Sequence, residues 1–221
     1  MTFWLTLPTA FILGLLHALD ADHVIAVTTF IARRPRPRQA VRFCLQWGLG
    51  HMVPLLVLGV GAILLGRRIP AAFAWAAELA VGGVLLVLGG LVFRDLWRRR
   101  IHLHVHEHDG VRHAHLHSHQ GGAHHAHTHG PTLVGIVHGL AGTAGVFVVV
   151  PVAALASAWA AAVYIVVFSV AVVLMMVLYG ASAGLVLGRF QERSLALYRW
   201  ALALVGTLSV GAGALWIGRL L

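Results

Sequence analysis

Four ionisable side chains lie close together near the start of the chain, within an apolar stretch long enough to cross a membrane. They fall in the seven-residue segment His17–His23, which holds two histidines and two aspartates. An Asp left at the centre of a membrane helix costs at least about 2.5 kcal/mol. Imidazoles and carboxylates together form a ligand set for divalent transition metals, so the segment indicates intramembrane metal transport.

An unbroken helix cannot direct all four side chains at one ion. At about 100° per residue, His17, Asp20 and His23 form one stripe, whereas Asp22 projects away from it. Two interpretations follow. Either Asp22 supports a ligand through a hydrogen bond, or the helix opens near Ala21 and the chain folds around the metal, as in the broken helices of many transporters. The alternative is a structural role, in which the four groups only pair with partner helices.

The composition indicates an integral membrane protein. The chain has 221 residues, of which 59% are hydrophobic and only 10% charged, whereas a soluble domain carries about 25% charged residues. The net charge of +9 comes from sixteen arginines, with no lysine. Because membrane proteins concentrate arginine in cytoplasmic loops, this charge does not indicate nucleic-acid binding. The single cysteine excludes an internal disulfide.

Apolar stretches of about 20 residues predict transmembrane helices, and the sequence contains six of them. They cover residues 3–31, 41–66, 71–97, 132–157, 160–188 and 198–220. Arginines gather in the first, third and fifth connections. The positive-inside rule therefore places these connections in the cytoplasm and both termini on the outer side of the cell membrane.

The predicted fold is an all-α integral membrane protein with two three-helix halves, 1–98 and 132–221, joined by segment 99–131. Gly14–Leu19 resembles Gly135–Leu140, which lies 121 residues later. With three helices in each half, the halves would have opposite orientations and form a 3+3 inverted repeat. A second similarity concerns glycines of the third and sixth helices: Gly83 and Gly90 have the same spacing as Gly206 and Gly213.

The connecting segment is rich in histidine. From His102 to Gly130 it has no apolar core, and we expect it to be flexible, disordered without metal, and able to buffer metal in the cytoplasm. Binding through neutral imidazoles should fall as the pH drops through about 6.5. Its twelve histidines are His102, His104, His106, His108, His113, His115, His117, His119, His124, His125, His127 and His129.

The other four histidines all fall within predicted spans. His51 follows Gly48 and Gly50, whose small size permits close helix approach. His138 takes the place of His17 in the second half and is a candidate ligand, gate or packing residue, with Thr143 a weaker oxygen donor nearby. The predicted metal site comprises His17, Asp22, His23 and His51, with Asp20 and His138 as lesser contributors.

The motif His17-x4-Asp22-His23 resembles the His-x4-Asp-His signature of the nickel/cobalt transporter family. Gly48–His51, after an Arg/Pro-rich loop, is similar to that family's second signature. Two departures are expected: the family's preceding helix has no counterpart, and His138–Thr143 stands where the family has an acidic segment. That segment looks more like the shorter urease-accessory permease branch. The resemblance implies nickel or cobalt as the transported ion.

We therefore expect a transporter of nickel, cobalt or both, with import favoured and efflux as the alternative. A metal sensor that does not conduct and an intramembrane metalloenzyme are the other classes. A rhomboid-like protease at Ser182 is disfavoured because no histidine follows His138 to serve as its base. The expected partners are the divalent ion, the lipid bilayer and a cytoplasmic metal chaperone. No enzyme activity and no resident cofactor are expected.

Overall fold

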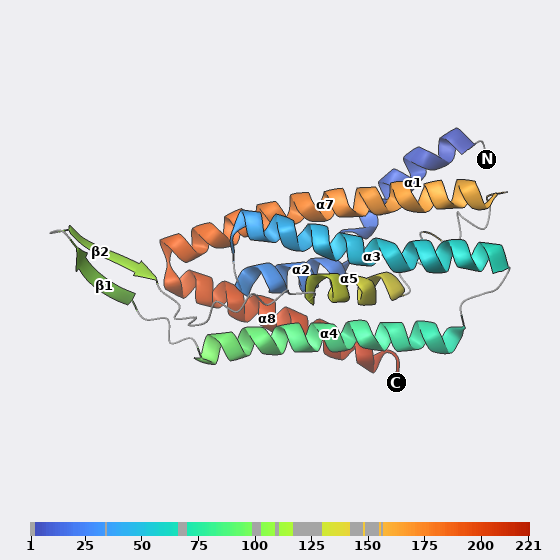
Figure 1. Ribbon diagram of the computed structural model, residues 1–221. Helices are drawn as coiled ribbons and strands as arrows, with labels where there is room; N and C mark the ends of the chain where they lie inside the picture. The colour runs from blue at the N-terminus through green and yellow to red at the C-terminus, as the bar shows by residue number, and fades with distance from the viewer. Residues whose placement is uncertain are drawn as a thin grey trace.

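The computed structural model describes residues 3–33, 35–65, 70–98, 103–108, 111–116, 130–141, 148, 155 and 157–221. Long helices run side by side in a bundle, and a small hairpin lies at one end (Figure 1). The helices are α1 (Phe3–His17), α2 (Ala21–Arg33), α3 (Pro37–Leu65), α4 (Ala71–Arg98), α5 (Gly130–Leu140), α7 (Ala158–Arg193) and α8 (Leu195–Gly218).

Four of these helices, α3, α4, α7 and α8, are long and apolar enough to cross a membrane. The pair α1 and α2 passes the same test together, with a bend of 54° between them, and would make a fifth span. The predicted fourth span, 132–157, is not seen as one helix. In the structure α5 ends at Leu140, and most of the remaining stretch lies outside the described residues. Six spans therefore stay a prediction.

The last two helices are longer than predicted and are joined by a single residue. We expected helices at 160–188 and 198–220, but α7 continues to Arg193 and α8 begins at Leu195. Ser194 caps both ends: its N–H donates to the Phe190 carbonyl, and its Oγ accepts from the Leu197 N–H. A serine that satisfies both helix ends allows a one-residue connection.

The bundle is built from antiparallel helix pairs that cross at glycines. Glycine has no Cβ, and in the α3–α7 pair there is no room for one. A Cβ added at Gly59 would lie 2.6 Å from Ile165 Cδ1, and one added at Gly180 would lie 2.5 Å from Cys44 Sγ. These two contacts are reciprocal at an offset of 121, because Gly180 follows Gly59 and Ile165 follows Cys44 by that number of residues. Helices α1 and α5 pack against α7 and α3 respectively.

The α4–α8 pair also makes reciprocal contacts, here at an offset of 124 residues and at slightly different glycines from those predicted. A Cβ at Gly89 would lie 2.9 Å from the Gly206 carbonyl oxygen, and one at Gly213 would lie 2.8 Å from that of Gly82. Gly83 and Gly90, which the sequence pattern singled out, face open space among the described residues. The contact-forming glycines are therefore one residue earlier in α4 than predicted.

Part of the His-rich segment has regular structure, which corrects the expectation of a disordered loop. Strands β1 (Leu103–His108) and β2 (Val111–Leu116) pair antiparallel, with His104 opposite His115 and His106 opposite His113. Alternating residue types have the two-residue period of a strand, which explains why this composition can pair. The rest of the segment lies outside the described residues.

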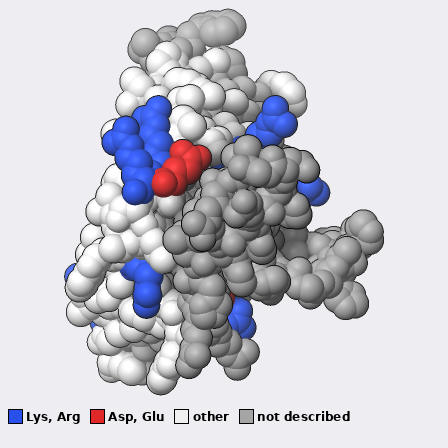
Figure 2. All heavy atoms as spheres, turned by 90° about the vertical axis from the view of Figure 1, so that its left-hand side faces the viewer, with Lys and Arg blue, Asp and Glu red and all other residues white. Residues whose placement is uncertain are grey.

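One end of the bundle carries most of the described arginines. At this end α2, α4 and α7 finish and α3 and α8 begin, and Figure 2 shows basic side chains gathered on it. Two contacts hold the end of α2 there. Arg33 Nε donates to Asp95 Oδ2 of α4 at 2.7 Å, and Tyr198 Oη of α8 donates to the Ala32 carbonyl at 2.7 Å. The arginines are Arg33, Arg36, Arg38, Arg42, Arg94, Arg189, Arg193 and Arg199.

Candidate metal site

The chain breaks its first apolar stretch at the ionisable segment. Helix α1 ends at His17 and α2 begins at Ala21. In the tight turn between them, the Leu19 N–H donates to the Leu16 carbonyl and the Asp20 N–H donates to the His17 carbonyl, both at 3.0 Å. The helix therefore opens just before Ala21, one of the two arrangements that the sequence left open. The break places His17 and His23 on different helices that converge on one point.

Three imidazole nitrogens meet at this point. His51 Nε2, from α3, lies 3.4 Å from His17 Nε2 and 3.3 Å from His23 Nε2. The three rings are almost completely buried, with exposed fractions of 0–1%. Tetrahedral ligands with metal–nitrogen bonds of about 2.0–2.1 Å lie about 3.3–3.4 Å apart. The two spacings to His51 Nε2 therefore suit a divalent transition metal, and the ligand atoms of all three residues lie within 4.8 Å of one another.

Two carboxylates orient the imidazoles from behind. His17 Nδ1 donates to Asp20 Oδ2 at 2.8 Å, and His23 Nδ1 donates to Asp22 Oδ1 at 2.9 Å. Because an ionised carboxylate only accepts hydrogen bonds, the proton of each neutral ring lies on Nδ1, and Nε2 carries the lone pair that can bind a metal. Carboxylate–histidine pairs of this kind fix the ring orientation and raise the basicity of metal-binding histidines.

The three nitrogens are arranged so that one cation could bind all of them. The Nε2 atoms of His17 and His23 both face Nε2 of His51, which can donate a hydrogen bond to only one of them. In addition, His51 Nδ1 is buried and has no hydrogen-bond partner within the described part of the chain. A single metal ion bound by all three Nε2 atoms would satisfy the lone pairs together.

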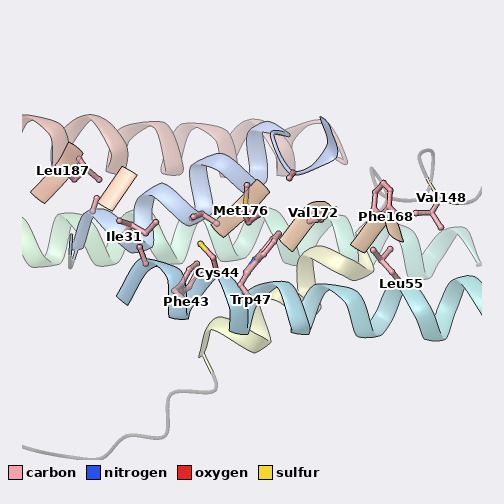
Figure 3. Close-up of a cluster of buried hydrophobic side chains, with 14 of the residues drawn as sticks. Ile31, Phe43, Cys44, Trp47, Leu55, Val148, Phe168, Val172, Met176 and Leu187 are labelled. Carbon is pink, nitrogen blue, oxygen red and sulfur yellow. The ribbon is translucent and has the colours of Figure 1, made fainter. Parts of the chain in front are cut away.

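Two aromatic side chains flank the site. Trp47 stacks on His51 at 5.1 Å between ring centroids and contacts the edge of His23 at 5.0 Å. Phe168, from α7, lies 5.4 Å from His17. Figure 3 shows both aromatic residues in the buried cluster between α3 and α7. Such an apolar shell limits the access of water and strengthens the electrostatic interactions inside it.

The structure brings together His17, His23 and His51, while the other predicted residues take different places. Asp22 and Asp20 both accept hydrogen bonds from a histidine, which for Asp22 is the supporting role that the sequence left open as one of its alternatives. His138 is buried nearby, with its ring 5.4 Å from that of His23. Thr143 and the side chains of the loop histidines lie outside the described part of the structure.

The sequence reasoning missed Trp47 and Phe168. Their signal was present, because Trp47 lies one helical turn before His51, and Phe168 follows Trp47 at the repeat offset of 121. Their contacts are also reciprocal. Phe168 lies beside His17, and Trp47 lies 6.0 Å from His138, the residue that follows His17 at the same offset.

Comparison with known proteins agrees with this chemistry. The chain is 29% identical over 191 residues to the urease accessory protein UreH of a Bacillus species, and the aligned residues make up 81% of this chain and 76% of that protein. It is 29% identical over 102 residues to a putative nickel/cobalt efflux system of Methanocaldococcus jannaschii, 45% of each chain. No solved structure gives a significant match. The model of the NicO family, described as high-affinity nickel-transport protein, matches residues 3–137, which is more than half of the chain. This multi-pass membrane protein therefore belongs to that family of metal-ion transporters, and not to a family of enzymes.

Proposed function

We propose that the protein moves Ni²⁺ or Co²⁺ across the membrane through the site formed by His17, His23 and His51. The observation that carries this proposal is the convergence of three buried Nε2 atoms, two of them 3.3–3.4 Å from the third, at a break in a membrane-length helix. Unwound backbone near the middle of a membrane is tolerated where it lines a binding site, and transporters use it to hold ions.

In this proposal Asp20 and Asp22 act through the histidines. Their two negative charges offset the double positive charge of the ion, while the imidazoles bind it as neutral ligands. The offset matters because an unpaired charge is costly in a low-dielectric interior. Asp22 is the more buried carboxylate, with a side-chain exposure of 2% against 29% for Asp20. We therefore expect the loss of Asp22 to be the more damaging.

We further propose that the two halves form the inverted repeat expected from the sequence. The support comes from reciprocal contacts at the 121-residue offset. Besides the α3–α7 crossing, a Cβ at Gly14 would lie 2.3 Å from the Phe168 carbonyl oxygen, and one at Gly135 would lie 2.0 Å from that of Trp47. An isologous arrangement requires such paired contacts. The three-histidine site would then lie near the pseudo-twofold axis, where alternating access operates in repeat transporters.

The proposed orientation puts the arginine-rich end in the cytoplasm and both termini outside. The His-rich segment follows α4 at that end, where it would collect ions on the cytoplasmic side and pass them to a cytoplasmic metal chaperone. We propose import, because a trap on the receiving side keeps the free ion concentration low. Efflux is the alternative, and the name of the archaeal relative favours it.

The alternatives that do not transport have less support. Within the described residues, the three histidines are the one group of three or more metal-binding side chains with closely spaced ligand atoms. A di-iron enzyme needs several carboxylate and imidazole ligands for two ions. A sensor would not need its ligands at a break in a spanning helix.

The test is uptake of radioactive nickel and cobalt into proteoliposomes that contain the full chain. We expect His17→Ala, His23→Ala and His51→Ala each to abolish transport while the protein stays folded in the membrane, and Asp22→Asn to lower it about 10- to 100-fold. Ser182→Ala is the control, because the Ser182 hydroxyl is exposed and donates to the Leu178 carbonyl one turn earlier in its own helix. Near-normal transport in all three histidine variants would contradict the proposal.

The direction of metal transport can be measured in the same proteoliposomes. Vesicles that hold the protein in one orientation, sorted by protease accessibility of the His-rich segment, are loaded or bathed with cobalt under a proton gradient of either sign. Import predicts net movement toward the side that carries this segment. Net movement away from it would establish efflux.

A further inference from the structure

The fourth buried histidine is prepared as a metal ligand but stands outside the three-histidine cluster. His138 Nδ1 donates to the Val134 carbonyl at 2.8 Å, one turn earlier in α5. In a neutral ring this leaves the lone pair on Nε2. That Nε2 atom is buried and has no hydrogen-bond partner among the residues that the structure describes. A fixed ring with a bare, buried nitrogen is the state in which histidines bind metals.

Glycines hold this histidine close to the site. A Cβ at Gly135 would lie 2.0 Å from the Trp47 carbonyl oxygen, and one at Gly139 would lie 2.4 Å from that of His51. The backbone of α5 therefore lies directly against the turn of α3 that carries His51. The His138 ring is 5.4 Å from that of His23, and its exposed fraction is 1%.

His138 is also the counterpart of His17. It follows His17 at the repeat offset, and its Trp47 neighbour matches the Phe168 neighbour of His17. In this structure His17 contributes Nε2 to the cluster and His138 does not. Inverted repeats reach their two access states by exchanging the arrangements of their halves.

We propose that His138 takes over from His17 as a ligand during transport, so that the ion passes from His17, His23 and His51 to a set that contains His138 Nε2. This inference rests on the proposed function and adds a second ion position to it. Because the resting site keeps its three ligands without His138, the loss of Nε2 should slow movement of the ion more than it weakens its first binding.

Two substitutions separate the ligand atom from the structural hydrogen bond. In His138→Asn the amide nitrogen stands near the place of Nδ1 and can still donate to the Val134 carbonyl, but nothing replaces Nε2. In His138→Gln the amide oxygen stands near the place of Nε2 and can contact the ion. A ligand role and a packing role therefore predict opposite rankings of the two variants.

The experiment measures initial rates of cobalt uptake against cobalt concentration in proteoliposomes that contain the full chain, with Ser182→Ala as the control. We expect His138→Asn to lower kcat about tenfold or more while KM changes less than about twofold, and His138→Gln to keep the larger kcat. Wild-type kcat in His138→Asn, or a defect confined to His138→Gln, would overturn the inference, as would a raised KM with unchanged kcat. These outcomes leave the proposed function intact, since that proposal fails only if the His17, His23 and His51 variants transport normally.

Discussion

Replacing Gly135 by alanine should disable transport by pushing α5 away from α3. The added Cβ would lie 2.0 Å from the Trp47 carbonyl oxygen and 2.9 Å from its carbonyl carbon. The obstacle is backbone, so no side-chain rotation can relieve it. Since real Cβ contacts are essentially never shorter than 3.0 Å, the two helices must separate by about 1 Å.

The expected effect has two parts. Overpacking of a close interface costs about 1–3 kcal/mol of stability. A displacement of about 1 Å at a site that binds its substrate in a fixed geometry can cost about 100-fold in rate. We therefore expect a lower melting temperature in detergent and a loss of cobalt transport of up to that size. Gly14→Ala, whose Cβ would lie 2.3 Å from the Phe168 carbonyl oxygen, should act in the same way from the other half.

The matched control is Gly90→Ala in α4. Gly90 is exposed, and a Cβ there would meet no described atom within 4 Å. Alanine in a helix interior is favoured over glycine by about 1 kcal/mol, so this variant should be as stable as the wild type or more stable, and fully active. Wild-type stability and transport in Gly135→Ala would refute the account of how α5 is held at the site.

Three further predictions concern the parts around the site. Arg33→Asp or Asp95→Arg alone should lower stability by about 1 kcal/mol and reduce transport, because each breaks the 2.7 Å ion pair that holds the end of α2. The double variant should restore stability and transport in the same melting and uptake assays. Replacing residues 102–129 with a short Gly/Ser linker should lower metal loading, measured by elemental analysis, but leave the preference between nickel and cobalt unchanged. In intact cells, single cysteines placed at 36–38 of a Cys44→Ser protein should resist an impermeant maleimide, and one at 66–69 should react; the reverse pattern would invert the proposed orientation.

The candidate ligands could be predicted from the sequence because ionisable side chains are costly in the hydrocarbon core of a membrane and are seldom found there without a function. Four histidines outside the loop all fell in apolar stretches, and the structure gathers His17, His23 and His51 around one point. The sequence offered the supporting role of Asp22 and the helix break near Ala21 only as alternatives to each other. On a regular helix Asp22 faces away from His17, and the structure shows that both alternatives occur together: the helix breaks before Ala21, and Asp22 contacts Nδ1 of the neighbouring His23.

Other features depend on details that a sequence pattern does not specify. Glycine doublets at 82–83 and 89–90 leave two helix faces about 100° apart as equal candidates, and the structure uses Gly82 and Gly89. The His-rich segment has a low-complexity composition that predicts disorder, but its alternation also has the period of a strand, and pairing of β1 with β2 decided between them. The single-residue connection at Ser194 required one side chain to serve both helix ends.

Anomalous diffraction from crystals of the full chain grown with cobalt would locate the bound ion directly. We expect a cobalt ion about 2.0–2.1 Å from the Nε2 atoms of His17, His23 and His51, with Asp20 and Asp22 still hydrogen-bonded to Nδ1 of His17 and His23. Cobalt bound only in the His-rich segment, with no anomalous peak between the three buried imidazoles, would contradict this expectation.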